Sequence, residues 1–347
     1  MKKEINKTMM NPTYLEEYFS NKGYECLNPF SVVNSGTDTI FTTAGIQPVL
    51  RNVMNGNLSP NNIYYVGQPV LRSQFIKSLG EGYSLAFNNC TTVAINNSSK
   101  DHDILVDDWL KCFYDLGLEK KYFSTRSKDY TDKWGEIELG GYKTFYIYKD
   151  TELGDATYFN YVSTNDSKVD IKTFSDVGFG LERIRWVCNP QKSYYDINGD
   201  TSMLEADKKA IISAIVLLVI NGVSPSNKDA GYRIRLFSKK IISDYGIDVL
   251  NSKLEKYMDD CINYWINWQK TANYDRDYIK DIIKKELDRN GNRYILDALE
   301  LSGFSNVKGV NINISREEFL KRLKGSGVNE IVLRKVLRRE DSKWIKE

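Results

Sequence analysis

Histidine is almost absent from this chain of 347 residues, because His102 is the only one. The five cysteines form no Cys-x-x-Cys pair and show no spacing to a histidine that is typical of metal ligands. A zinc site, a Ser-His-Asp triad and a Cys-His dyad are therefore excluded, unless His102 alone serves. The odd number of cysteines and the lack of a signal peptide predict a reducing, cytoplasmic location.

Long hydrophobic runs are also missing. The most apolar segment, residues 211–220, is interrupted by Ser213 and is about half as long as the roughly 20 residues that a membrane helix needs. We therefore expect a buried core helix there and no contact with a membrane. No period of 20–50 residues recurs, which argues against a solenoid or propeller.

Composition and charge point to a globular protein of two domains. The chain is 41% hydrophobic and 27% charged, and its length exceeds that of one average domain. Residues 1–190 hold 20 basic and 23 acidic side chains, a net charge of −3, whereas residues 191–347 hold 28 and 23, a net charge of +5. The second half is therefore favoured as the surface for a polyanion, with an ordinary solvated helical surface as the alternative.

The secondary-structure signal changes near residue 190. Before it, two helical segments, 12–22 and 103–116, accompany short β-rich runs at residues 39–42, 63–66, 85–87, 91–95, 144–148 and 157–162. After it, helical periodicity dominates, at residues 207–220, 232–244, 248–268 and 275–289. The sequence therefore predicts an α+β fold, with a strand-rich domain over 1–192 and a mainly helical domain over 193–347.

One glycine-containing segment carries the strongest chemical signal. Residues 176–183 read Asp-Val-Gly-Phe-Gly-Leu-Glu-Arg, and Gly178 and Gly180 end a strand-like run just before a predicted helix. Missing side chains let the backbone approach a ligand there. Arg183, in the first helical turn, suits a triphosphate because its charged fork binds two oxygens. A plain strand-to-helix joint is the alternative, but the acid Asp176 beside this pattern favours a ligand site.

Two further segments carry candidate residues. Arg72 closes the strand-like run Gly-Gln-Pro-Val-Leu-Arg at 67–72, which a polar loop separates from a second run beginning at Tyr83. Burying an arginine without a partner is costly, so Arg72 either reaches an anion or points to solvent. Residues 41–48 read Phe-Thr-Thr-Ala-Gly-Ile-Gln-Pro, an apolar run that ends in a turn of small residues.

Together these segments resemble the catalytic core of class II aminoacyl-tRNA synthetases, and specifically the alanyl-tRNA synthetase family. Residues 41–48 resemble that family's Phe-Thr-Asn-Ala-Gly-Met motif, Arg72 matches its motif 2 arginine, and 176–183 resembles its motif 3, Asp-Thr-Gly-Met-Gly-Leu-Glu-Arg. Residues 221–235 resemble the family's Asp-Gly-Val-Leu-Pro-Ser-Asn-Glu-Gly-Arg-Gly-Tyr-Val-Leu-Arg, from its helical tRNA-recognition domain. The resemblance covers most of the chain, in order.

The resemblance implies an antiparallel class II sheet flanked by helices, which binds ATP with Mg²⁺ and activates a small amino acid such as alanine for transfer to tRNA. Arg72 would then bridge the amino-acid carboxylate and the α-phosphate, and Arg183 would hold the γ-phosphate, beside the backbone of Gly178 and Gly180. Phe87 would stack on adenine, although a core aromatic fits its position equally well. The ligands of Mg²⁺ stay open.

The same resemblance assigns most of the remaining candidates. Asp176 would pair with the α-ammonium group, while Trp134 and Asn160 would line the amino-acid pocket. For the acceptor stem of tRNA, the resemblance assigns Asn227, with Glu300 as its partner. The basic residues Arg233, Arg235 and Lys239 are predicted from the residues themselves, as a run on one helix that would contact the phosphates of tRNA.

Several departures from the family pattern leave two other functions open. The loop after Arg72 is short, Asn88 stands where the family has glutamate, Glu300 stands where it has aspartate, and the chain ends before any editing domain. One alternative is a tRNA-independent ligase that passes the acyl group to a small molecule or carrier protein. The other is a catalytically inactive, tRNA-binding regulatory paralogue. The oligomeric state stays open.

Overall fold

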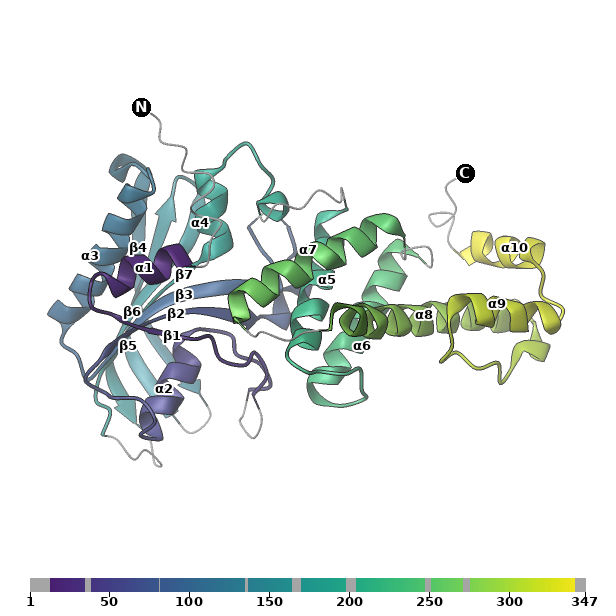
Figure 1. The fold of residues 1–347 in the computed structure, drawn as a ribbon, viewed down its shortest axis with the longest axis horizontal. Coiled ribbons are helices and arrows are strands. Elements are labelled where there is room, and N and C mark those ends of the chain that lie inside the picture. The colour runs from purple at the N-terminus through teal and green to yellow at the C-terminus, as the bar shows by residue number, and fades with distance from the viewer. Residues whose placement is uncertain are drawn as a thin grey trace. The chain divides into compact units, whose positions relative to one another are not determined.

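The computed structural model describes residues 13–34, 39–80, 82–134, 137–163, 170–197, 204–246, 251–270 and 275–340 (Figure 1). The chain forms two compact units, Met1–Asp200 with Tyr264–Ala272, and Thr201–Asn263 with Asn273–Glu347. The first unit contains a sheet flanked by helices and the second is helical, so the predicted α+β fold is confirmed.

The first unit is built on one seven-stranded sheet. Its strand order is β1-β2-β3-β7-β6-β5-β4, and all neighbours are antiparallel except β1 and β2. The strands are β1 Glu25–Leu27, β2 Ile63–Leu71, β3 Ala86–Ile95, β4 Phe123–Trp134, β5 Ile137–Tyr148, β6 Thr151–Ser163 and β7 Phe174–Gly180. The order places β3 and β7, which are distant in sequence, side by side at the middle of the sheet.

Side chains alternate between the two faces of each strand, and each face has its own core. On one face, Tyr65, Cys90 and Val177 pack against three helices, α1 Thr13–Ser20, α3 Ser99–Asp115 and α4 Leu181–Cys188. On the other face, Val66 and Val93 pack against α2, Ile46–Met54. We call these the three-helix face and the α2 face.

The second unit consists of helices. α5 (Ala206–Ile220), α6 (Asp229–Tyr245) and α8 (Arg276–Leu301) pack on one another, and α9 (Arg316–Gly325) and α10 (Glu330–Glu340) pack on α8. α5 is the predicted core helix and is buried on nearly all sides. α7, Ser252–Gln269, begins in this unit, but its residues from Tyr264 onward belong to the first unit.

Two sequence predictions differ from the structure. Residues 39–42 form no strand, because Phe41 makes only a single bridge to Val33. The helix predicted over 275–289 runs on to Leu301, through Gly291. A side chain at Gly291 would overlap the Arg316 guanidinium, so this glycine makes room for a neighbour and does not end the helix.

Two absences can be stated for the described residues. No helix there is both long and apolar enough to cross a bilayer. All five cysteines are free thiols.

The close approach of β5 to β6 predicts a sharp difference between two adjacent glycines. A Cβ atom on Gly141 would lie 2.0 Å from the carbonyl oxygen of Tyr158, whereas one on Gly140 would approach nothing closer than 3.5 Å. Gly141→Ala should therefore cost roughly 1–3 kcal/mol by overpacking and lower Tm by several degrees. Gly140→Ala is the control and should lie near wild type in thermal unfolding. Equal Tm values for the two variants would contradict the steric account.

Candidate active site

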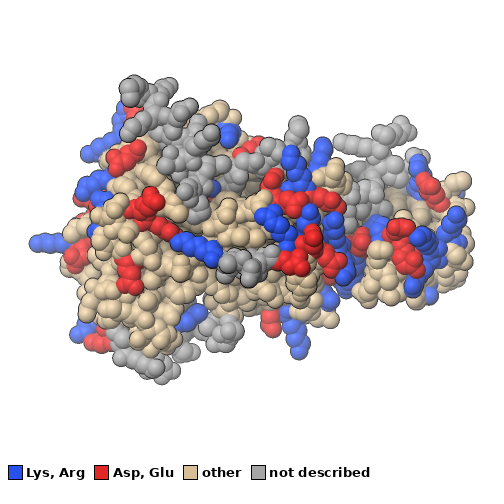
Figure 2. Space-filling view, viewed as in Figure 1, with Lys and Arg blue, Asp and Glu red and all other residues tan. Residues whose placement is uncertain are grey.

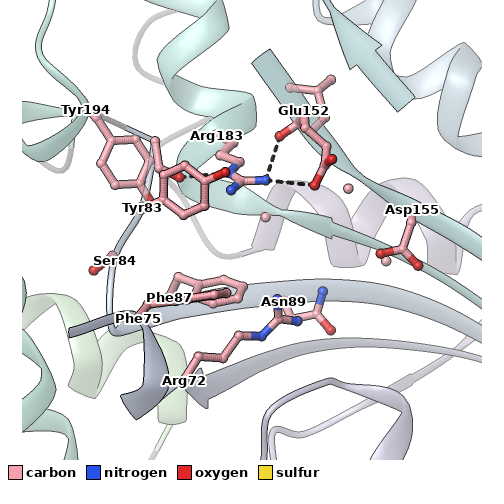
Figure 3. Close-up of a pocket in the computed structure, with 15 residues that line it drawn as sticks. Arg72, Phe75, Tyr83, Ser84, Phe87, Asn89, Glu152, Asp155, Arg183 and Tyr194 are labelled. Atoms are coloured by element: carbon pink, nitrogen blue, oxygen red, sulfur yellow. Dashed lines mark hydrogen bonds and ion pairs between the residues drawn. The ribbon is translucent and has the colours of Figure 1, made fainter. Parts of the chain in front are cut away.

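A cavity of about 290 Å³ lies over the middle of the sheet (Figure 3). Phe87 and Asn89 of β3 and Gly178 of β7 line it on the α2 face. Strand alternation and register place them on the same side of the sheet as Val93. The lining residues are Arg72, Phe75, Gly82, Tyr83, Ser84, Phe87, Asn89, Glu152, Leu153, Gly154, Asp155, Gly178, Gly180, Arg183 and Tyr194. The structure thus brings together all five residues predicted to bind the nucleotide.

Arg72 directly follows β2 and lies on the wall of the cavity with Phe87 (Figure 3). Its Nε donates to the carbonyl oxygen of Thr43 at 2.9 Å, and its guanidinium stands 4.9 Å from the centroid of the Phe87 ring. Burial lowers the pKa of Arg72, yet a guanidinium keeps its charge at every ordinary pH. Within the described part of the chain it forms no ion pair with a carboxylate, so this charge is available to an anion.

Arg183 faces the cavity from the side opposite Arg72 and Phe87 (Figure 3). It is the third residue of α4, and its Nε donates to the Gly82 carbonyl oxygen at 2.9 Å. Its NH1 donates to the Glu152 carbonyl oxygen at 2.8 Å and lies 3.5 Å from the Glu152 carboxylate. Strand end, loop and helix therefore hold this guanidinium in place.

Gly178 and Asp176 stand two residues apart on β7, but only Gly178 lines the cavity. A Cβ atom on Gly178 would lie 3.0 Å from the Asn89 amide nitrogen, so this position is tight. Asp176 lies outside the cavity lining, where its Oδ1 accepts from Thr91 Oγ1 at 2.6 Å. Burial is the main cause that raises the pKa of Asp176 to about 6, and the nearby Asp155 adds to it.

Trp134 and Asn160, both predicted for the amino-acid pocket, lie outside the residues that line the cavity. The Trp134 ring packs on Phe159 and Phe174, with centroids 5.8 and 6.3 Å away, and belongs to the periphery of the α2-face core. Asn160 is exposed at the register shift between β5 and β6. The geometry gives these two residues no contact with Arg72 or Arg183.

Two carboxylates of β6, Glu152 and Asp155, line the cavity and were not foreseen from the sequence. Asp155 pairs with Lys143 of β5 at 3.0 Å and accepts from Thr157 Oγ1 at 3.0 Å. Mg²⁺ in nucleotide sites takes one or two carboxylates and completes its shell with phosphate and water. Glu152 and Asp155 fit that requirement, although the described residues contain no cluster of three or more potential metal ligands.

The candidates for tRNA binding lie in the helical unit. Asn227 accepts a hydrogen bond from Arg235 NH1, and Arg235 Nε lies 3.9 Å from the carboxylate of Glu286, which is only 4% exposed. Arg235 and Glu286 line a second cavity, of about 510 Å³, along α8. Asn227 therefore lies closer to Glu286 than to Glu300, its predicted partner, because Glu300 lies about 21 Å further along α8 than Glu286.

The basic side chains of the helical unit are interspersed with acidic ones (Figure 2). Lys239 is exposed and Arg233 is half-buried on α6. Neighbouring lysines form ion pairs, as Lys240 does with Asp244 at 2.6 Å and Lys285 with Asp281 at 2.7 Å. The surface is therefore charged without being strongly basic.

Comparison with known proteins adds no assignment. No protein-family model matches the chain, and no curated protein matches it either.

The raised pKa of Asp176 predicts a pH-dependent cost to stability. Its folded-state pKa of about 6 exceeds the ordinary value of 3.8, so ionisation destabilises the fold increasingly from about pH 4 to pH 6, and fully above that. Because Asp176 is partly exposed, we expect Asp176→Asn to gain only about 1–2 kcal/mol at pH 7. The gain in Tm should vanish towards pH 4. Asp129→Asn, at an exposed position of β4, is the control, and a pH-independent difference for Asp176→Asn would refute the assignment.

Proposed function

We propose that this protein is an ATP-dependent ligase of the class II aminoacyl-tRNA synthetase type, similar to alanyl-tRNA synthetase. It activates a small amino acid as the aminoacyl-adenylate, releases pyrophosphate, and transfers the acyl group to tRNA. The observation that carries the proposal is the convergence of two arginines, Arg72 and Arg183, on one cavity over the antiparallel strands of a mixed sheet. They come from segments about 110 residues apart that independently resemble motifs 2 and 3.

The charge distribution of the cavity supports adenylate formation. An oxygen of the amino-acid carboxylate attacks the α-phosphorus, the bond to the bridging oxygen breaks, and pyrophosphate leaves. Negative charge grows on the α-phosphate oxygens, where the guanidinium of Arg72, which forms no ion pair with the described carboxylates, stabilises it. Arg183 binds the γ-phosphate end of the triphosphate. Its guanidinium then either leaves the Glu152 carboxylate or contacts the carboxylate and the phosphate together.

The substrate-binding groups have complementary roles. The Phe87 ring, with one face covered by Arg72, offers an aromatic surface to the adenine base. Asp176, which lies on the same face of β7 as Gly178 but outside the cavity lining, supplies negative charge for the α-ammonium group. A Mg²⁺ ion bound with ATP would be held by Glu152 and Asp155 and would neutralise phosphate charge. The chemistry needs no general base, which agrees with a chain that has one histidine.

The identity of the acyl acceptor has two candidates. The helical unit favours tRNA, because Asn227 and Arg233 lie in the segment 221–235 that resembles the tRNA-recognition segment and Lys239 adds an exposed positive charge further along α6. The neutralisation of several lysines by acidic neighbours favours the alternative, a tRNA-independent ligase, because phosphate contacts need unpaired cations. A catalytically inactive tRNA-binding paralogue is the third candidate, and ATP–pyrophosphate exchange over all amino acids separates it from both enzymes.

Arg72→Ala should abolish most activation. Removing one charge-stabilising donor lowers the rate by on the order of a hundredfold or more, so ATP–pyrophosphate exchange should fall by that factor. Arg51→Ala is the matched control, because Arg51 lies on α2 of the same unit, outside the cavity lining. Near-normal exchange in Arg72→Ala would rule out its role.

Substitutions in α6 and in the loop before it test the acceptor. If tRNA binds there, Lys239→Glu and Asn227→Ala should weaken the binding of total tRNA in a filter assay. Removing one phosphate contact should also reduce the slope of log K against log salt concentration by about one. Lys321→Glu, at an exposed position of α9, is the control. Unchanged affinity in both test variants, with exchange activity intact, would favour the tRNA-independent ligase.

A further inference from the structure

A buried carboxylate lies on the three-helix face, behind the cavity. Glu182 precedes Arg183 in the first turn of α4 and is 5% exposed. Adjacent helical residues point about 100° apart, so Arg183 faces the cavity while Glu182 turns to the back of the sheet. Burial raises the pKa of Glu182, while the hydrogen bond from Tyr264 and the charge of Arg185 oppose that rise.

Glu182 is joined directly to β3. Both of its carboxylate oxygens accept from the backbone N–H of Asn88 at 3.1 Å, and Oε1 also accepts from the Asn88 side chain at 3.3 Å. The pairing of β3 with β7 ends one residue away, at Asn89 and Gly180, so the carboxylate continues the hydrogen bonding beyond the end of β7. Asn88 stands between Phe87 and Asn89, which both line the cavity.

The end of α7 completes this network. Tyr264 Oη donates to Glu182 Oε1 at 2.6 Å and accepts from Asn88 Nδ2 at 2.7 Å. One turn later, Trp268 packs so close to β2 that a Cβ atom on Gly67 would lie 2.8 Å from its ring. The Arg185 guanidinium stands 5.8 Å from the centroids of both aromatic rings. The Tyr264 hydroxyl group thus links α7, α4 and β3.

We propose that Tyr264 is a positioning residue for the ATP site. Its hydroxyl fixes Glu182 against Asn88, and this contact sets the orientation of α4 relative to β3. α4 carries Arg183 on one side of the cavity, and β3 carries Phe87 and Asn89 on the other. Loss of the hydroxyl leaves a buried carboxylate short of one donor and frees α4 to shift. The inference rests on the proposed function, because its consequence is measured as use of ATP.

The test is Tyr264→Phe, which removes one oxygen atom and keeps the ring. Tyr257→Phe is the matched control, since Tyr257 lies two turns earlier on the same helix, is buried, and donates one hydrogen bond to the Lys209 carbonyl oxygen at 3.1 Å. We expect kcat/KM for ATP in pyrophosphate exchange to fall about tenfold or more in Tyr264→Phe and to stay within about twofold in Tyr257→Phe. Tm of both variants is measured, and the assay temperature is kept well below it.

A second measurement needs no substrate. Hydrogen exchange should show loss of protection at the Asn88 amide in Tyr264→Phe and not in Tyr257→Phe. Wild-type kinetics in Tyr264→Phe, or an unchanged Asn88 amide, would overturn the positioning role while the proposed function stands. A wild-type protein without exchange activity for any amino acid would overturn both.

Discussion

The pairing of β3 with β2 on one side and β7 on the other is the interaction on which the site depends. It sets Phe87 close to Arg72, and Gly180 opposite Asn89, although these residues come from segments that are far apart in the sequence. Because strands alternate, the same pairing sends Asn88 to the opposite face, where it meets Glu182. One register therefore determines both the cavity and the buried network behind it.

Most elements with a clear hydrophobic pattern were predictable from the sequence. The runs at 63–66, 91–95, 144–148 and 157–162 all fall within strands, and each contains at least one buried residue. β4 escaped prediction because it is an edge strand whose side chains are nearly all exposed, so nothing selects an apolar alternation. α8 was cut short because the fit of Gly291 to Arg316 depends on a residue 25 positions away.

The site residues also divide into those that a local motif marks and those that depend on residues far away in the sequence. Arg72, Phe87, Gly178, Gly180 and Arg183 stand in short segments with recognisable motifs, and the structure gathers them in one cavity. Glu152 and Asp155 carry no such motif. Asp155 reaches the cavity because β6 pairs it with Gly178, and that register depends on the whole sheet. Trp134 and Asn160 show the converse, since likeness to a family segment does not fix the face or depth of a side chain.

The division of α7 between the two units has a consequence for modularity. The first unit is discontinuous in sequence, because more than 60 residues of the helical unit separate residue 200 from Tyr264 and Trp268, which belong to the first unit. A gene fragment ending near residue 200 would therefore encode the sheet and every residue that lines the cavity over it, yet it would lack the aromatic pair Tyr264 and Trp268. Exchange or loss of the helical unit by a single recombination would remove part of the first unit as well.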